Sequence, residues 1–125
     1  MADNEMNDVE ALRAHALSDE ADDRGDVEFV IHREARFEVR APTLADVKSI
    51  RKVCVDAKGN VDEMRMSILT LVACTFAPGT DKKVFTRADE EKLMTKRPSK
   101  NSLVAKLLGA LRKVQSVDAE TETGE

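Results

Sequence analysis

The sequence predicts an α+β fold: an N-terminal β-hairpin followed by four α-helices, packed as a small, mainly helical domain. Between residues 27 and 41, apolar and polar residues alternate, which is the period of a strand. Further along the chain, apolar residues recur every three or four positions in separate segments, which is the period of a helix. The length of 125 residues, 42% of them hydrophobic, suits one domain with its own core.

The hairpin is predicted from residues 27–32 and 36–41, joined by a short polar connection at 33–35. In the first strand we expect Val27, Phe29 and Ile31 to share the buried face. In the second we expect Phe37, Val39 and Ala41 to face inward, with Arg36, Glu38 and Arg40 outward. A hairpin alone is marginal in water, so one face must pack on helices.

The helices are predicted from caps and apolar stripes. Pro42 ends the second strand, and Thr43 with Asp46 forms a capping box that opens the first helix, which we expect to stop at Gly59. The second helix, 60–76, has the broadest apolar face and is expected to be the most buried. Thr86 and Asp89 repeat the capping box before a short third helix. Pro98 and Ser99 precede a fourth helix with a stripe of Leu103, Val104, Leu107, Leu108, Leu111 and Val114.

Charge divides the chain into three parts. Residues 1–26 hold nine acidic and two basic residues, 27–117 hold eighteen basic and eleven acidic, and 118–125 hold four acidic and no basic. We therefore expect an acidic N-terminal segment at 1–26, weakly helical or disordered, a single α+β domain at 27–116, and an acidic disordered tail at 117–125.

Composition excludes several classes of protein. Aromatic residues are 3% of the chain, all of them Phe, which argues against a stacking platform for single-stranded nucleic acid. The sequence has no apolar run long enough for a membrane span, and its polar, acidic start does not resemble a secretory signal. We expect a soluble protein of the cytoplasm.

No catalytic or metal-binding constellation is recognisable. Cys54 and Cys74 lie on or beside apolar helical faces and lack the spacing of a zinc site, so we interpret them as small buried residues. His15 and His32 have no recognisable nucleophile partner. Acidic pairs at 62–63 and 90–91 lie in first helical turns, where the helix dipole favours them. We expect no enzyme activity, no cofactor and no metal.

Two binding functions remain open. The segment around Lys96, Arg97 and Lys100 superficially resembles a helix-turn-helix, but the helix after it is so apolar that we favour a structural turn with a basic rim over DNA binding. The fourth helix has more apolar surface than a cap needs, so part of it could meet a partner helix or another subunit. The residues predicted to bind a partner are Leu103, Leu107, Leu108 and Leu111, with Met64 and Met66 as adaptable contacts.

The order of these parts resembles the tail assembly chaperones of long-tailed bacteriophages. The family pattern has an acidic start, a hairpin, two helices, a Gly/Asp turn, a Lys-x-hydrophobic-Phe-Thr-x-x-Asp-x-x-x-Leu segment and a final apolar helix. Here the turn and segment run from Gly79 through Lys82, Phe85-Thr86 and Asp89 to Leu93. The resemblance covers roughly residues 27–115.

The resemblance implies a protein that binds the tape measure protein and keeps it soluble while tail tube protein assembles around it. Binding would be stoichiometric and without ATP, by a self-associating protein in the host cytoplasm that is absent from the mature virion. The alternatives are a helix-turn-helix-like DNA-binding protein and a small structural component of the tail or baseplate.

Overall fold

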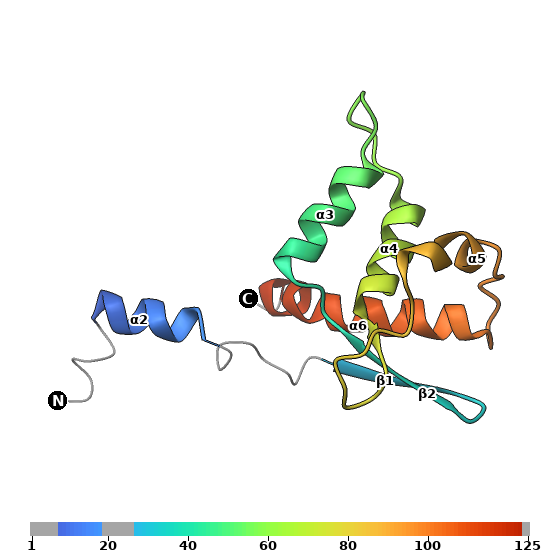
Figure 1. Cartoon of the computed structure of the whole chain (residues 1–125), viewed down its shortest axis with the longest axis horizontal. Helices are drawn as coiled ribbons and strands as arrows, with labels where there is room; N and C mark the ends of the chain where they lie inside the picture. Colours follow the sequence, from blue (N-terminus) through green and yellow to red (C-terminus); the bar gives the residue numbers. More distant parts are fainter. Residues whose placement is uncertain (1–7, 19–26, 124–125) are drawn as a thin grey trace.

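The computed structural model describes residues 8–18 and 27–123, with side chains of the last helix described as far as Gln115. Within these ranges the fold combines a three-stranded antiparallel sheet with five α-helices and one 3₁₀ helix (Figure 1). The helices and strands are α2 (Val9–Ala16), β1 (Val27–His32), β2 (Ala35–Arg40), α3 (Leu44–Cys54), α4 (Glu63–Cys74), β3 (Thr75–Phe76), η2 (Arg87–Asp89), α5 (Glu90–Met94) and α6 (Leu103–Thr123). The mixed class is confirmed, but a helix precedes the hairpin and a third strand joins it. No described helix is long and apolar enough to cross a membrane.

The predicted hairpin forms, but the predicted buried face of its first strand is wrong. In the register of β1 with β2, Val30 lies opposite Phe37 and Glu28 opposite Val39. Val30 and Val39 are buried at 6% and 0% exposure, whereas Phe29 and Ile31 are each 56% exposed. Because side chains alternate along a strand, burying Val30 turns Phe29 and Ile31 to the other face of the sheet. Val39 faces inward as predicted.

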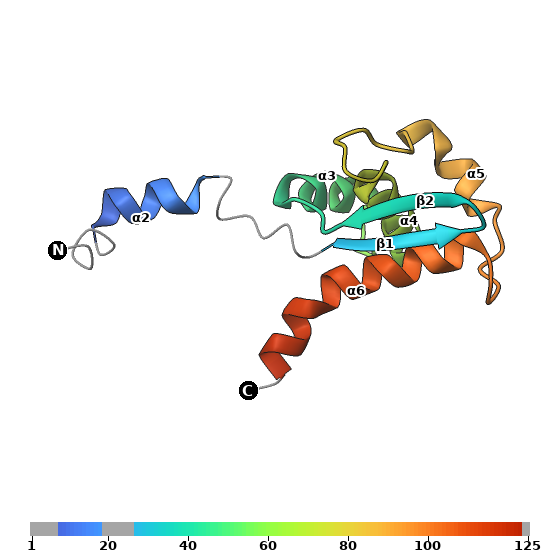
Figure 2. The same ribbon diagram turned by 90° about the horizontal axis from the view of Figure 1, so that it is seen from below.

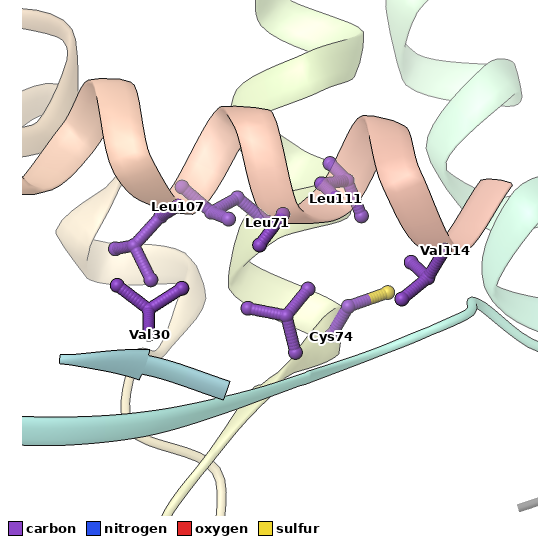
Figure 3. Packing of buried hydrophobic residues seen from close by; sticks show 8 residues of the cluster. Val30, Leu71, Cys74, Leu107, Leu111 and Val114 are labelled. Carbon is purple, nitrogen blue, oxygen red and sulfur yellow. The ribbon is translucent and has the colours of Figure 1, made fainter. Parts of the chain in front are cut away.

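The core lies between the inner face of the sheet and helices α4 and α6 (Figures 2 and 3). The sheet, α4 and α6 all contribute buried residues to it: Val30 and Val39 from the sheet, Leu71 and Cys74 from α4, and Leu107, Ala110, Leu111 and Val114 from α6. Helix α4 is buried almost continuously from Ile68 to Val72, so the prediction that it is the central helix is confirmed.

Both predicted capping boxes are present. The Asp46 amide donates to Thr43 Oγ1 at 3.1 Å, and the Thr43 amide donates to Asp46 Oδ2 at 3.2 Å, which starts α3. Thr86 and Asp89 make the same arrangement, but it opens η2, which leads into the five-residue α5.

Three predicted ends differ from the structure. Helix α3 stops at Cys54 because Val55 pairs with Val61 across a small turn, in which Gly59 has a φ of 87°. Helix α4 stops at Cys74 because residues 75–76 pair with β2 as β3. Helix α6 extends to Thr123, into the segment that the sequence predicts to be an acidic disordered tail. In the acidic N-terminal segment, α2 forms, while residues 1–7 and 19–26 lie outside the described part.

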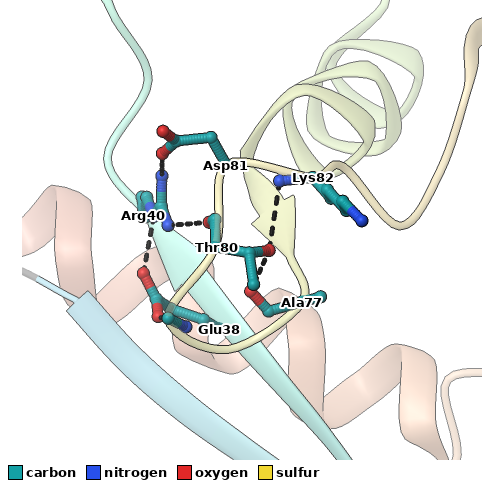
Figure 4. A network of polar contacts seen from close by, with 7 residues as sticks. Glu38, Arg40, Ala77, Thr80, Asp81 and Lys82 are labelled. Atoms are coloured by element: carbon teal, nitrogen blue, oxygen red, sulfur yellow. Dashed lines mark hydrogen bonds and ion pairs between the residues drawn. The ribbon is translucent and has the colours of Figure 1, made fainter.

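A polar network fixes the turn after β3 against β2 (Figure 4). Arg40 Nε donates to Glu38 Oε2 at 2.5 Å, and the other guanidinium nitrogens donate to Asp81 Oδ1 and to the Thr80 carbonyl oxygen. The guanidinium also stacks 4.0 Å from the centre of the Phe76 ring. Burial opposes the charge of Arg40, but its hydrogen bonds to Glu38 and Asp81 outweigh that effect and raise its pKa. Glu38, predicted to face solvent, is 7% exposed and also accepts from the Gly79 amide.

Candidate protein-binding site

The six residues predicted to bind a partner divide between the core and the surface. Leu107 and Leu111 are 1% and 4% exposed and belong to the core cluster under the sheet. Both side chains therefore pack in the core, and the prediction of an exposed contact is wrong for them: Leu107 is covered, and Leu111 contributes only to the floor of a surface hollow. Leu103 is half-buried against the same cluster. Met66 is half-buried against a second cluster of Ile50, Cys54 and Leu69.

Met64 and Leu108 come together at the surface. They line two neighbouring hollows of about 210 Å³ and 150 Å³ at the junction of α4, α5 and α6. We call the two hollows together the Met64–Leu108 groove. The larger hollow is lined by Met64, Ile68, Leu93, Met94, Lys96, Pro98, Val104 and Leu108. The smaller one is lined by Met64, Ser67, Leu108, Leu111, Arg112 and Gln115.

Local structure places Met64 on the rim of the groove. Asp62 caps α4 by accepting from the Arg65 amide at 3.0 Å, which puts Met64 in the first turn of the helix. Met64 is 57% exposed, although it is a large apolar side chain.

An ion pair holds α5 against α4. Arg65 Nε donates to Glu90 Oε2 at 2.7 Å, and its Nη1 donates to the Val53 carbonyl oxygen at 3.2 Å. The hydrogen bond with Glu90 raises the pKa of Arg65. Since α5 has five residues, this contact and the burial of Leu93 fix the helix and place Met94 at the groove, where it is 47% exposed.

The lining of the groove suits an apolar helix. Two thioether side chains from different helices can adapt to irregular apolar surfaces, because methionine is unbranched and polarizable. Lys96 and Arg112 add positive charge at the lining. Met94 also lines the groove but was not among the predicted contacts, although the apolar pair Leu93-Met94 was the available signal.

The described residues contain no group of three or more His, Cys, Asp or Glu side chains placed to hold a metal ion. Cys54 and Cys74 are unpaired with each other and buried, as predicted for small core residues. Burial raises the pKa of the Cys54 thiol and raises that of Cys74 to about 12, which disfavours the nucleophilic thiolate.

The basic segment between α5 and α6 lacks the geometry of a helix-turn-helix. Residues 95–102 separate the two helices, whereas that motif joins its helices by a turn of three or four residues. Lys96, Arg97 and Lys100 are exposed. The first turns of α6, where a recognition helix would present side chains to DNA, contain the buried Val104 and Leu107.

Comparison of the chain with known proteins finds no matching family model, no matching curated protein and no matching solved structure.

Proposed function

We propose that this protein is a phage tail assembly chaperone that binds the tape measure protein and keeps it soluble while tail tube protein assembles around it. The observation that best supports the proposal is the Met64–Leu108 groove, in which Met64 and Met94 remain exposed beside half-buried Leu108. An adaptable apolar surface of this kind can bind an apolar helix of a partner, because the apolar face of that helix can lie in the groove.

The second support is the order of parts that resembles the family, from the hairpin through the Phe85-Thr86 segment to the apolar α6. The proposed action is stoichiometric binding without ATP, in the host cytoplasm, by a self-associating protein that does not remain in the mature virion. Presence of the chain in purified particles would instead indicate a structural tail or baseplate component.

The test is co-expression with a long, helix-rich tape measure protein, followed by sizing of the soluble fraction. We expect the wild-type chain to carry the partner into solution as a large complex. Met64→Asp should reduce this yield, because it places a charge on an apolar contact surface.

Leu44→Asp is the matched control. Leu44 is 88% exposed and, like Met64, lies in the first turn of a helix, where an acidic residue is tolerated. The proposal fails if the partner stays insoluble with the wild-type chain, or if the two substitutions reduce the yield equally.

A further inference from the structure

A second apolar groove lies between α3, α4 and the segment that precedes η2. Its volume is about 390 Å³, and its lining is apolar at Ile50, Leu69, Val72, Ala73 and Phe85. Lys83 and Arg87 contribute positive charge, and Ser49 and Thr86 complete the lining. We call it the α3–α4 groove.

The apolar surface continues along α3 beyond the groove. Val47 is 41% exposed and lies three residues before Ile50, so both are on the same face of the helix. Leu44, a further three residues back, is 88% exposed. Along this stripe the structure buries Ile50 and Cys54 and leaves Leu44 and Val47 uncovered.

Helix α2 has the complementary surface. Val9 and Leu12 share one face of the helix, and with Leu17 just beyond its end they are 76%, 45% and 70% exposed. No residue of α2 is buried, and Figure 1 shows the helix apart from the other elements. An eight-residue helix is marginal in water without packing, so this face calls for a contact surface.

Charge also matches. The N-terminal end of α2 carries the acidic Asp8 and Glu10, and its last turn carries Arg13 and His15. The α3–α4 groove has Lys83 and Arg87 in its lining, and α3 itself carries Lys48, Arg51 and Lys52 against Asp46. An amphipathic helix with an acidic N-terminal end therefore fits both the apolar floor and the basic rim of the groove.

The chain is long enough for α2 to reach this groove in its own molecule. Nine peptide steps from Ser18 to Val27 span at most about 30 Å. Val27 pairs with Arg40, and the path from Arg40 to Ser49 in the middle of α3 is at most about 22 Å, part extended chain and part helix. A tether of this length gives a local concentration on the order of millimolar, which favours the same molecule over a second copy.

We propose that α2 docks in the α3–α4 groove of its own chain, with Val9 and Leu12 against Ile50, Val72 and Phe85 and with Asp8 and Glu10 toward Lys83 and Arg87. The groove is thereby a binding site for an amphipathic helix with an acidic N-terminal end, and the chain's own α2 occupies it. This site is separate from the Met64–Leu108 groove and does not depend on the proposed function.

The test uses a spin label on the full-length chain at Ala14→Cys, on the polar side of α2, with amide signals read by NMR. The buried Cys54 and Cys74 react slowly, so the label goes to the introduced thiol. We expect loss of signal intensity at Ser49, Ala73 and Phe85, independent of protein concentration.

Two substitutions make the test specific. Leu12→Asp should restore the groove signals without unfolding the domain, because α2 has no buried residue. Lys83→Glu should weaken the effect, since it removes positive charge from the groove while leaving the backbone pairing of residue 83 intact. Lys92→Glu, the same charge change on α5 outside the groove lining, is the matched control.

Four results would overturn the proposal: no signal loss in the groove, signal loss at Phe29 and Ile31 instead, persistence of the effect in Leu12→Asp, or signal loss that appears only between separately labelled copies.

Discussion

Replacing Leu107 with alanine tests whether α6 closes the core or presents its stripe to a partner. Leu107 is 1% exposed and belongs to the cluster that joins α6 to Val30 and Leu71. Truncation of a buried leucine removes apolar contact and leaves a cavity, at a cost of roughly 2–5 kcal/mol. We expect a loss of about 3 kcal/mol in the free energy of unfolding. Leu107 lies between the sheet and α4, and these two elements cannot both move to fill the cavity that the alanine leaves.

The assay is urea unfolding followed by circular dichroism. With a denaturant slope of about 2 kcal/mol per molar, this loss lowers the midpoint by about 1.5 M. Leu44→Ala is the control, since the same substitution at an 88% exposed side chain should change stability by less than about 0.5 kcal/mol. Half-buried Leu108→Ala should fall between them. Equal midpoints for the Leu107 and Leu44 variants, with unchanged slopes, would refute the packing of α6 against the sheet and α4.

Four further outcomes are expected. Thr43→Ala should cost about 1 kcal/mol in urea unfolding, because it removes the hydroxyl that accepts from the first turn of α3, and an unchanged midpoint would count against the cap. Gly109→Ala should stabilise by about 0.5–1 kcal/mol, since the residue is inside α6 and nothing lies within 4 Å of an added Cβ; destabilisation would contradict this. The Cys74 thiol should stay unreactive toward a disulfide reagent at pH 8 until the protein unfolds, and a fast reaction in the folded protein would show that the site is open. Because burial raises the pKa of this thiol to about 12, the free energy of unfolding should fall as pH rises above the ordinary thiol pKa of 9.0. Hydrogen bonds from the Asn60 and Lys58 amides lower the pKa of Asp56, so its ionised carboxylate stabilises the fold above pH 3.8, and this stabilisation is lost as pH falls through the lowered pKa. In acid titrations the wild type should therefore lose stability that Asp56→Asn does not lose. Identical profiles for the two proteins would argue against the turn.

Local chemistry explains what the sequence predicted correctly. The Thr43 and Asp46 cap depends on residues three apart, so its pattern can be recognised without knowledge of the rest of the fold. The apolar face of α4 is so broad that its burial from Ile68 to Val72 follows from composition alone.

Long-range pairing explains the errors. In β1, the apolar alternation of Phe29 and Ile31 is stronger in the sequence than the signal of Val30 alone. The buried face of the strand is instead decided by the pairing of Val30 with Phe37 on the side of the sheet where α6 packs. The strand at Thr75–Phe76 continues a helical pattern and becomes β3 because residues 38–39 of β2 offer a free edge to pair with.

At the candidate site, too, contacts between distant segments decide which apolar residues are buried. A stripe of leucines looks the same whether it closes a core or binds a partner, because both need apolar residues at helical spacing. The sheet covers the Leu107 and Leu111 side of α6 and leaves Leu108 half-buried beside Met64. Met94 lies at the groove because the ion pair between Arg65 and Glu90 fixes the position of α5. These two residues are 25 positions apart, so the sequence pattern alone does not reveal the contact.

The most direct test of the proposed function is a titration of the methionine methyl signals with soluble fragments of a tape measure protein. Met64 and Met94 line the Met64–Leu108 groove and are exposed, whereas Met66 packs against the cluster of Ile50, Cys54 and Leu69. We predict that the methyl signals of Met64 and Met94 shift in a saturable way while that of Met66 stays in place. Saturable binding that leaves the Met64 and Met94 signals unmoved, or no binding by any fragment, would contradict the proposed function.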